Sequence, residues 1–415
     1  MYGKVIMRGP LGCQSHGMFI LITHARSAAL RGPVMQSVLL ICELNLGIGH
    51  LSRMMILGSA LSHRFRVVLV VLTEFTTEIE SRPGIEVRII LRDPSAVMKQ
   101  HRLTEAALLE VAGDLRPDAI IVEYFPFGRL ASAFFFLPFF RKIRALYGES
   151  LQILSSIRDI DDCSTDIFEP ESILKLLNKE FDGVLVHSDP EWVRIEDMFP
   201  ATSRIQIPVY YTNYVSRHSR AGTAPERSQT ILVSAGGGRG GEALLHCAAI
   251  AAKAGLLRPY RVRIIAGKML LQQDWNDLLT LCADAGDTLE LLRWVPDLYT
   301  ELRTAMVSVS RCGYNTTLDL LASGIPALVV PVSNDKADEQ VKRARLLADR
   351  GVLRMLPESE MTPESLAAEI LHTITFQPAP LNIKLDGAEQ TCDIVSSLTA
   401  SQQLREQGSR AFASR

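Results

Sequence analysis

One strand–helix–strand pattern constrains the fold of this chain more than any other feature. Two short apolar runs, 306–309 and 327–330, flank residues 314–322, which have helical character. Gly324 and Pro326 follow, as is typical of a helix end, because glycine adopts a left-handed conformation and proline cannot continue a helix. The pattern predicts a βαβ unit, which requires a right-handed crossover and a parallel sheet that is buried on both faces.

The same alternation of strands and helices occurs on both sides of a break in the chain. The first set of expected strands comprises residues 36–43, 66–73, 85–91, 119–123, 151–157, 183–187 and 204–207. The second set comprises residues 230–234, 261–266, 288–294, 306–309, 327–330 and 352–355. Helices are expected at residues 50–63, 104–115, 131–146 (interrupted at Pro138) and 362–375. This order predicts two α/β domains, each with a doubly wound parallel sheet.

Composition and turn formers set the expected boundaries of these domains. The length of 415 residues suits two domains. Residues 214–229 are rich in Ser, Arg, Gly, Thr and Pro and are expected to be a linker. It separates an N-terminal domain at 35–213 from a C-terminal domain at 230–378, and a tail follows at 379–415. Residues 1–34 are expected to be a disordered or misassigned extension, with a targeting peptide as the alternative.

Charge and cysteine usage exclude several classes of function. The net charge of −2 does not favour nucleic-acid binding, which requires a basic face. The seven cysteines are scattered without metal-ligand spacing, which indicates reduced thiols in a cytoplasmic protein and no metal site. No apolar run is long enough to span a membrane. The aromatic segment 133–144 is expected either to pack on the sheet or to contact a membrane peripherally.

A glycine-rich loop, Gly236–Gly241 in the run AGGGRGGE, follows the strand at 230–234. Glycines let the backbone approach a diphosphate, and the next helix N-terminus supplies donors. A nicotinamide site would need an acid after the next strand, but that strand ends in Ala266-Gly267-Lys268. Phosphate binding by Arg239 and by backbone amides is therefore favoured, and a tight turn without a ligand is the alternative.

A second polar turn joins the strand at 306–309 to the helix at 314–322. It contains small and hydroxylic residues followed by Asp319. Amides at a helix N-terminus bind phosphate, and a nearby carboxylate can hold a ribose diol. We therefore expect Asn315 and Thr316 to face phosphates and Asp319 to bind a ribose. A solvated helix acid is the alternative for Asp319.

In the first domain, His50 follows the first strand in the loop Gly47-Ile-Gly49-His50. A histidine at the carboxyl end of such a strand is well placed as a general base. Glu123 ends the fourth strand and is expected to orient His50 or to bind the acceptor, meaning the substrate whose hydroxyl this base would deprotonate. Arg53, one helical turn beyond His50, is expected to bind an acceptor anion or to lie at the surface. Arg158 and Asp159 are expected to line the cleft of this doubly wound sheet or to cap a helix, without a metal.

The segment RCGYNTTLDLLASGIPALVVPVSNDKADEQ, residues 311–340, resembles the sugar-nucleotide signature of MurG-type transferases, glycosyltransferase family 28 with a GT-B fold. The resemblance covers residues 230–350, with a shorter match at 38–53. It implies two Rossmann-like domains that face a cleft, with the C-terminal tail crossing back to the first domain. The Gly47–His50 loop resembles part of the family's GGxGGH loop but keeps only two of its glycines.

The resemblance also implies the donor-binding residues, in which Asp319 replaces a usual glutamate and Gly238 a usual serine. Asp319 would hold the ribose, the backbone at Val295 would recognise the base, and Glu339 and Gln340 would bind sugar hydroxyls. The full set is Gly237, Gly238, Arg239, Gly240, Val295, Arg311, Gly313, Asn315, Thr316, Asp319, Glu339 and Gln340.

The function implied by this resemblance is transfer of a hexosyl or N-acetylhexosaminyl group from a nucleotide sugar, expected to be a UDP-sugar, to an acceptor hydroxyl. The reaction would invert the anomeric carbon and need no metal or other cofactor. Two alternatives stay open. One is a catalytically silent homologue that binds a sugar nucleotide or a partner enzyme, and the other is a sugar-nucleotide 2-epimerase of the same fold.

Overall fold

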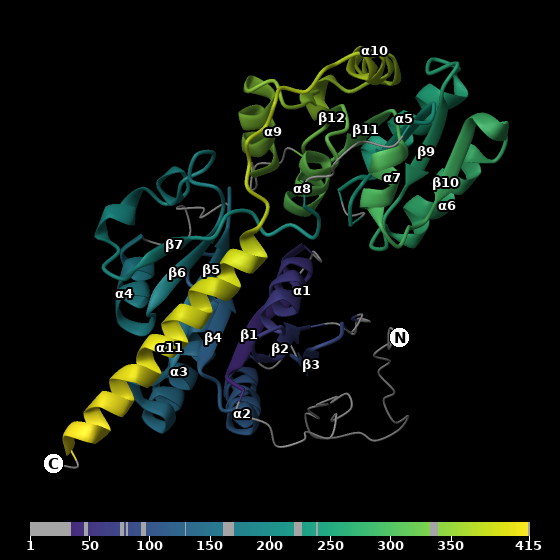
Figure 1. Cartoon of the computed structure of the whole chain (residues 1–415). Helices are drawn as coiled ribbons and strands as arrows, with labels where there is room; N and C mark the ends of the chain where they lie inside the picture. Colours follow the sequence, from purple (N-terminus) through teal and green to yellow (C-terminus); the bar gives the residue numbers. More distant parts are fainter. Residues whose placement is uncertain are drawn as a thin grey trace, which may run out of the picture. The chain divides into compact units, whose positions relative to one another are not determined.

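The computed structural model describes residues 35–44, 49–74, 79, 82–92, 97–128, 130–160, 170–219, 226–237, 240–332 and 339–413 (Figure 1). The expected N-terminal extension, residues 1–34, lies outside this range. The described chain forms two compact units. Unit 1 comprises residues up to Val215 together with the segment from Asp386 onward, and unit 2 comprises Ser216–Leu385. The expected linker, residues 214–229, is thus divided between the two units.

The described part of unit 1 contains a seven-stranded parallel sheet with the order β3-β2-β1-β4-β5-β6-β7. Its strands are β1 (Ser37–Leu44), β2 (Arg66–Thr73), β3 (Ile85–Leu91), β4 (Ala119–Glu123), β5 (Gln152–Arg158), β6 (Gly183–His187) and β7 (Val209–Tyr211). Its helices are α1 (Gly49–Leu61), α2 (Val97–Leu115), α3 (Ala133–Tyr147), α4 (Pro170–Glu180) and α11 (Gly387–Ala413). Every residue of β1 and β4 is buried, as expected for a parallel sheet that is covered on both faces.

Two hydrophobic clusters lie on the opposite faces of this sheet. Alternate residues of β1 belong to different clusters, as the twofold repeat of a strand requires: Leu39 and Ile41 pack with α2, α3 and α4, whereas Val38 and Leu40 pack with α1 and α11. The polar C-terminal tail thus forms α11, which lies beside α1 (Figure 1).

Two sequence-based expectations in unit 1 are wrong. Residues 204–207 do not form a strand, because a 3-10 helix at Pro200–Arg204 precedes them and pairing with β6 begins only at Pro208, whose carbonyl accepts from the Val184 amide at 2.9 Å. Helix α3 is also continuous through Pro138. Proline removes one hydrogen bond there, and four neighbouring buried phenylalanines anchor the helix: Phe135, Phe136, Phe139 and Phe140.

The described part of unit 2 contains a six-stranded parallel sheet with the order β10-β9-β8-β11-β12-β13. Its strands are β8 (Thr230–Ser234), β9 (Arg261–Ile265), β10 (Leu289–Leu292), β11 (Val307–Ser310), β12 (Ala327–Val329) and β13 (Arg354–Met355). Its helices are α5 (Glu242–Lys253), α6 (Gln272–Cys282), α7 (Leu298–Thr304), α8 (Tyr314–Ser323), α9 (Glu339–Asp349) and α10 (Pro363–Ile374). Gly324 caps α8 in a left-handed conformation, as its sequence position predicts.

Both sheets reverse their strand order beside their first strand. In unit 2 the chain runs from β8 outward through β9 and β10, and then returns to β11 on the other side of β8. Ligands of doubly wound sheets bind at such a switch point, outside the carboxyl ends of the strands. The loops that follow β8 and β11 in unit 2, and those that follow β1 and β4 in unit 1, therefore occupy the positions at which binding sites are expected.

Candidate functional site

The two polar loops of unit 2 lie in contact at the switch point. Gly236, in the loop after β8, has a φ of +62°, and a Cβ atom on it would lie 3.1 Å from Oγ1 of Thr316 in α8. The carbonyl of Gly237 accepts a hydrogen bond from the Met269 amide at 2.9 Å, which ties this loop to the loop after β9. Gly238 and Arg239 lie outside the described residues.

Both loops lead directly into helix N-termini. The N-cap residues of α5 and α8, Gly241 and Gly313, carry no side chain that could cap the first turn. The first backbone amides of an α-helix have no partner within the helix, and the helix dipole adds positive potential there. The contacting loops therefore direct two helix N-termini, with Asn315 and Thr316 in the first turn of α8, toward one region that suits an anion.

Asp319 lies farther along α8, and its surroundings change its acidity. The pKa of this carboxyl group is raised to about 7, mainly by burial; the positive charge of Arg217 lowers it, and the negative charge of Asp297 adds to the rise. The side chain keeps partial solvent exposure. A carboxyl group that is partly desolvated beside a charge cluster is typical of functional sites, and it can accept hydrogen bonds from a diol when ionised.

A cluster that was not predicted from the sequence surrounds Asp297. The His218 ring stacks on Tyr299 with ring centroids 3.9 Å apart, and its Nε2 atom lies 3.6 Å from Oδ1 of Asp297. Desolvation lowers the pKa of His218. Asp297 also caps α7 by accepting from the Tyr299 amide at 3.2 Å. No sequence pattern identifies this cluster, because His218 comes from a segment 79 positions before Asp297.

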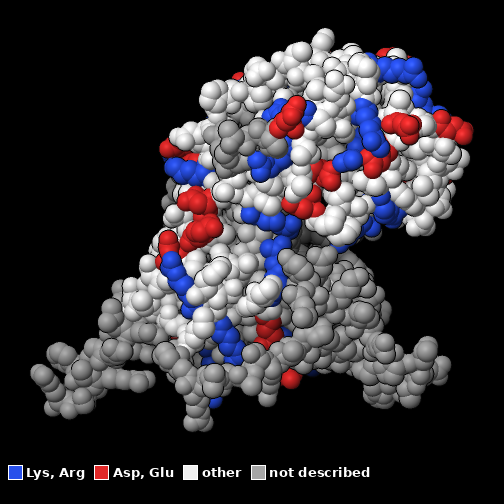
Figure 2. All heavy atoms as spheres, turned by 45° about the vertical axis from the view of Figure 1, so that its right-hand side comes forward, with Lys and Arg blue, Asp and Glu red and all other residues white. Residues whose placement is uncertain are grey.

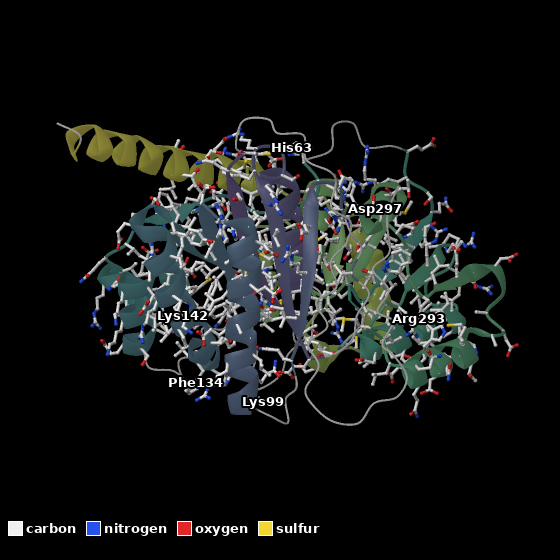
Figure 3. The ribbon with its side chains drawn as sticks, turned by 90° about the horizontal axis from the view of Figure 1, so that it is seen from below. His63, Lys99, Phe134, Lys142, Arg293 and Asp297 are labelled. Atoms are coloured by element: carbon white, nitrogen blue, oxygen red, sulfur yellow. The ribbon has the colours of Figure 1, made fainter. Side chains whose placement is uncertain are left out.

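The expected base-binding segment lies at the carboxyl end of β10. Val295 is partly buried and follows Trp294, whose side chain is 44% exposed. The Lys268 ammonium group, from the loop after β9, lies 3.8 Å from the centroid of the Trp294 ring. Figure 3 shows Arg293 and Asp297, which flank this segment, on unit 2. The backbone of Val295 thus follows an exposed aromatic ring that is covered by a cation.

The structure gives Arg311 an environment other than the donor contact that the resemblance implies. Its guanidinium group is buried, with Nη1 donating to the Val330 carbonyl at 2.9 Å and Nη2 donating to Glu358 at 2.5 Å. Because the guanidinium group makes these bonds in the interior of unit 2, Arg311 holds the loop after β11 rather than a ligand. Glu339 and Gln340 begin α9, and the side-chain oxygen of Gln340 accepts from the Cys312 amide at 3.2 Å.

In unit 1, His50 and Glu123 come together at the carboxyl ends of β1 and β4. The Nδ1 atom of His50, in the first turn of α1, forms a short hydrogen bond with Oε1 of Glu123. The His50 side chain is 20% exposed, whereas that of Glu123 is fully buried. A buried carboxylate that binds Nδ1 fixes the orientation of the ring and leaves Nε2 available for proton transfer. Gly49 begins α1 beside His50, and Gly47 lies outside the described residues.

Arg53 corrects an expectation. Its side chain is 1% exposed, and Nη2 donates to Oε1 of Glu123 at 2.7 Å. A guanidinium group that is buried against a carboxylate cannot reach an acceptor anion, so Arg53 is neither an acceptor ligand nor a surface residue. It instead compensates the buried charge of Glu123, which would otherwise be costly.

The two other acceptor candidates lie near the end of β5. Arg158 is partly exposed, whereas Asp159 is only 2% exposed. Arg158 pairs in register with His187 of β6. His187 is fully buried between Ser156, at 2.8 Å from Nε2, and Thr212, at 2.7 Å from Nδ1. Desolvation holds its pKa well below the usual range, so this histidine is neutral.

A further buried acid at the carboxyl edge of unit 1 was missed from the sequence. Glu43 of β1 accepts from Ser132 at 2.6 Å and pairs with Arg92 at 2.9 Å. The position of Glu43 within an apolar strand was the available signal, because a charge in a buried strand needs a partner. Among the described residues, no group of three or more His, Cys, Asp or Glu side chains is arranged to hold a metal ion.

Comparison with known proteins finds a family match for the part of the chain that carries these loops. Residues 230–392 match the family model described as the glycosyltransferase family 28 C-terminal domain. Residues 230–392 are called the family 28 domain below, after this match. The predicted resemblance to MurG-type transferases is confirmed.

Curated relatives match part of this chain. A UDP-N-acetylglucosamine–N-acetylmuramyl-(pentapeptide) pyrophosphoryl-undecaprenol N-acetylglucosamine transferase from Nitrobacter hamburgensis is 34% identical over 115 residues, which is 26% of this chain and 31% of the relative. The protein of the same name from Phenylobacterium zucineum is 28% identical over 173 residues, which is 40% of this chain and 47% of the relative. The chain thus matches between about a third and a half of the length of these relatives.

Solved structures extend the fold comparison beyond the family 28 domain. Acinetobacter baumannii MurG superposes with a TM-score of 0.55 at 18% identity, covering 87% of this chain and 99% of that protein. The calicheamicin glycosyltransferase CalG4 superposes with a TM-score of 0.52 at 16% identity, covering 92% and 99%. The expected GT-B fold, with two Rossmann-like parallel-sheet domains, is confirmed.

Proposed function

We propose that this protein is a metal-independent, inverting glycosyltransferase that uses a UDP-sugar as the donor. The observation that carries the proposal is the contact between Gly236 and Thr316, which brings two helix N-termini of the family 28 domain to one switch point. A diphosphate is the part of a nucleotide sugar that such paired N-termini bind best. The curated relatives carry UDP-N-acetylglucosamine in their names, which supports uridine as the base and N-acetylhexosamine as one candidate sugar.

The donor would be held by residues of unit 2 alone. The backbone amides after Gly240 and Gly313 would bind the diphosphate, with Asn315 and Thr316 beside it and Arg239 as a further expected contact. Asp319 would accept from the ribose hydroxyls, and the Val295 backbone would recognise the base. Glu339 and Gln340 would bind the sugar hydroxyls. These assignments follow the family resemblance, and the contact of Gly236 with Thr316 supports the part that concerns the diphosphate.

The acceptor would be activated by unit 1. The Nε2 atom of His50 would take the proton from the acceptor hydroxyl as its oxygen bonds to the anomeric carbon. The bond between that carbon and the diphosphate oxygen breaks in the same step, and UDP leaves with its charge stabilised by the helix N-termini. Glu123 would orient His50 and stabilise the imidazolium that forms, with Arg53 compensating the buried carboxylate. Attack opposite the leaving group inverts the anomeric centre.

We further propose that the protein is cytoplasmic and contacts a membrane peripherally. Of the aromatic run in α3, Phe135, Phe136, Phe139 and Phe140 are buried in the core, so most of this segment packs on the sheet. Phe134 is 65% exposed, and Figure 3 shows it at the outer surface with Lys99 and Lys142. No helix in the described part of the chain is long and apolar enough to span a membrane.

The charge distribution agrees with binding to a small anionic substrate rather than to a nucleic acid. On the face shown in Figure 2, basic and acidic side chains are interspersed over the described surface. The site proposed here gains its positive potential from helix ends, which act locally, and not from a broad basic face.

Calorimetry and transfer assays test the proposed function. We expect the full chain to bind UDP and UDP-N-acetylglucosamine more tightly than GDP or dTDP derivatives. It should also release UDP from the donor when suitable acceptors are supplied, at the same rate with and without EDTA. Binding without any turnover would support the silent homologue instead, and interconversion of the donor without an acceptor would support an epimerase. Absence of nucleotide binding would refute the proposal.

A further inference from the structure

Helix α9 holds the backbone of Cys312 from both sides. The Gln340 side-chain oxygen accepts from the Cys312 amide at 3.2 Å, and Nη1 of Arg343 donates to the Cys312 carbonyl at 2.9 Å. Gln340 and Arg343 are three residues apart, so they lie on one face of α9. The same Gln340 oxygen also accepts from the Val332 amide at 3.3 Å. These two side chains, here called the α9 clamp, join the loops after β11 and β12.

Of the two residues of the α9 clamp, Arg343 is buried and Gln340 is partly buried. Arg343 is 2% exposed, and its Nη2 atom lies 4.0 Å from Glu339. A hydrogen bond from a buried guanidinium group to a carbonyl is stronger than a neutral one, and its removal leaves a buried acceptor unsatisfied. The α9 clamp therefore restricts the position of the Cys312 peptide groups more than a surface contact would.

The peptide groups of Cys312 set the start of α8. Gly313 follows as the N-cap residue, and its carbonyl accepts from the Thr317 amide at 2.9 Å, which begins the helix. Arg311 is fixed on the preceding side by Val330 and Glu358. With residues 311 and 312 both held, the direction of the first α8 amides is set by hydrogen bonds to groups outside the loop, namely the Val330 carbonyl, Glu358 and the α9 clamp.

We propose that Gln340 and Arg343 are positioning residues for the diphosphate, acting through Cys312 on the N-terminus of α8. The inference rests on the proposed function and extends it. Because both lone pairs of the Gln340 oxygen are used by backbone amides, its NH₂ group is the part that can reach a donor hydroxyl. Sugar recognition and diphosphate binding are then coupled through one side chain, since any displacement of Gln340 also displaces the loop after β11.

UDP, which lacks the sugar, separates this role from simple sugar contact. Gln340→Leu removes the acceptor and should weaken UDP binding about tenfold, a change equivalent to 1.4 kcal/mol. Gln340→Glu keeps an acceptor oxygen and should retain the UDP affinity of the natural protein, while losing the NH₂ contribution to UDP-sugar affinity. If Gln340 contacts only the sugar, UDP affinity is unchanged in both variants, and the proposal is overturned.

A matched pair on the same helix tests the second member of the clamp. Arg343→Met should weaken UDP binding, Arg343→Lys should restore part of it, and Arg345→Met, which removes an exposed arginine of α9, should have no effect. Equal effects of Arg343→Met and Arg345→Met would show that only net charge matters and would overturn the clamp. Thermal unfolding of each variant identifies misfolding, in which case the Gln340 pair decides. Failure of the natural protein to bind UDP would instead refute the proposed function.

Discussion

At the scale of single residues, Asp319 shows how burial alters a group that sequence alone describes only as an acid. Desolvation disfavours its charged form, and Asp297 adds repulsion, so its pKa rises from 3.8 to about 7. The folded protein therefore binds a proton at Asp319 more tightly than the unfolded chain does. The stability associated with this group is present at low pH and is lost as the pH rises between these two values.

We expect Asp319→Asn to stabilise the protein at pH 8 relative to the natural sequence, and to have little effect at pH 4. One pKa unit corresponds to about 1.4 kcal/mol, so the shift sets an upper limit of about 4 kcal/mol on the gain. Urea unfolding at both pH values measures it. A gain of equal size at both pH values would show that the carboxyl group is not the cause.

The ionisation of Asp319 should also affect donor affinity. Donor affinity should rise with pH, whereas stability falls. In the proposed site the ionised carboxylate would accept from both ribose hydroxyls, so UDP-sugar affinity should rise about tenfold between pH 6 and pH 8, following the ionised fraction of a group with a pKa near 7. A UDP-sugar is the better probe because the terminal phosphate of UDP itself titrates in this range. Calorimetry of Asp319→Asn provides the control, for which we expect weaker binding without this pH dependence.

His50 offers a test of catalysis that is independent of donor binding. We expect His50→Ala to keep UDP-sugar affinity within about threefold and to lower the transfer rate by a factor of about 10² to 10⁴, the usual contribution of a general base. His63, an exposed histidine just beyond α1, is the matched control, and His63→Ala should leave both quantities unchanged. Parallel loss of affinity and rate in His50→Ala would assign His50 a structural role.

At the scale of elements, the loops after β8 and β11 owe their contact to glycine. Gly236 has a positive φ and lies against Thr316, so any side chain there is strained and also crowds α8. Gly286 provides a close comparison: its φ is +57°, but a Cβ atom on it would have no neighbour within 4 Å. The two positions share the backbone penalty and differ in the contact.

We therefore expect the shared backbone strain to lower the free energy of unfolding by about 1 kcal/mol in both Gly236→Ala and Gly286→Ala, with a further loss in Gly236→Ala from its contact with Thr316. Only Gly236→Ala should also weaken UDP binding, because the added methyl group separates the loop from Thr316. Denaturant unfolding and calorimetry measure the two effects. Weaker UDP binding in Gly286→Ala would show that the loss reflects general destabilisation.

At the scale of the whole molecule, α11 completes unit 1 although it follows unit 2 in the sequence. Ala388, Cys392 and Val395 of α11 belong to the same core cluster as α1 and β1. Because Val395 is fully buried, a charge at this position would be placed in an apolar environment. Unit 1 thus depends on the last segment of the chain for one covered face of its sheet.

Val395→Asp should raise amide hydrogen exchange in α1, β1 and β2 and leave the exchange of β8 and β11 unchanged. The reason is that the buried charge opens the cluster shared by α1 and α11, whereas unit 2 has a core of its own. Ser397→Asp on the exposed side of the same helix is the matched control. A uniform rise of exchange in both units would contradict this assignment.

Much of this architecture follows from local pattern. Continuous apolar strands such as 66–73 and 119–123 and the helix end at Gly324 were predicted with their observed bounds, because burial on both faces and a left-handed cap leave strong signals. The strand at 204–207 was wrong, because Ile205 and Ile207 pack against the core from a loop while pairing starts at Pro208. Apolar residues indicate burial but do not by themselves indicate hydrogen-bond pairing.

The two α/β sets, the glycine-rich and hydroxylic turns, and the resemblance of 311–340 to family 28 were all predictable, because each depends on residues close together in the chain. Which polar groups share a partner became visible only in the folded structure. It placed His50 and Arg53 on one oxygen of Glu123, moved Arg311 into the interior, and brought Gln340 and Arg343 to Cys312. Such pairings depend on strand order and burial, which bring together residues that are distant in the sequence.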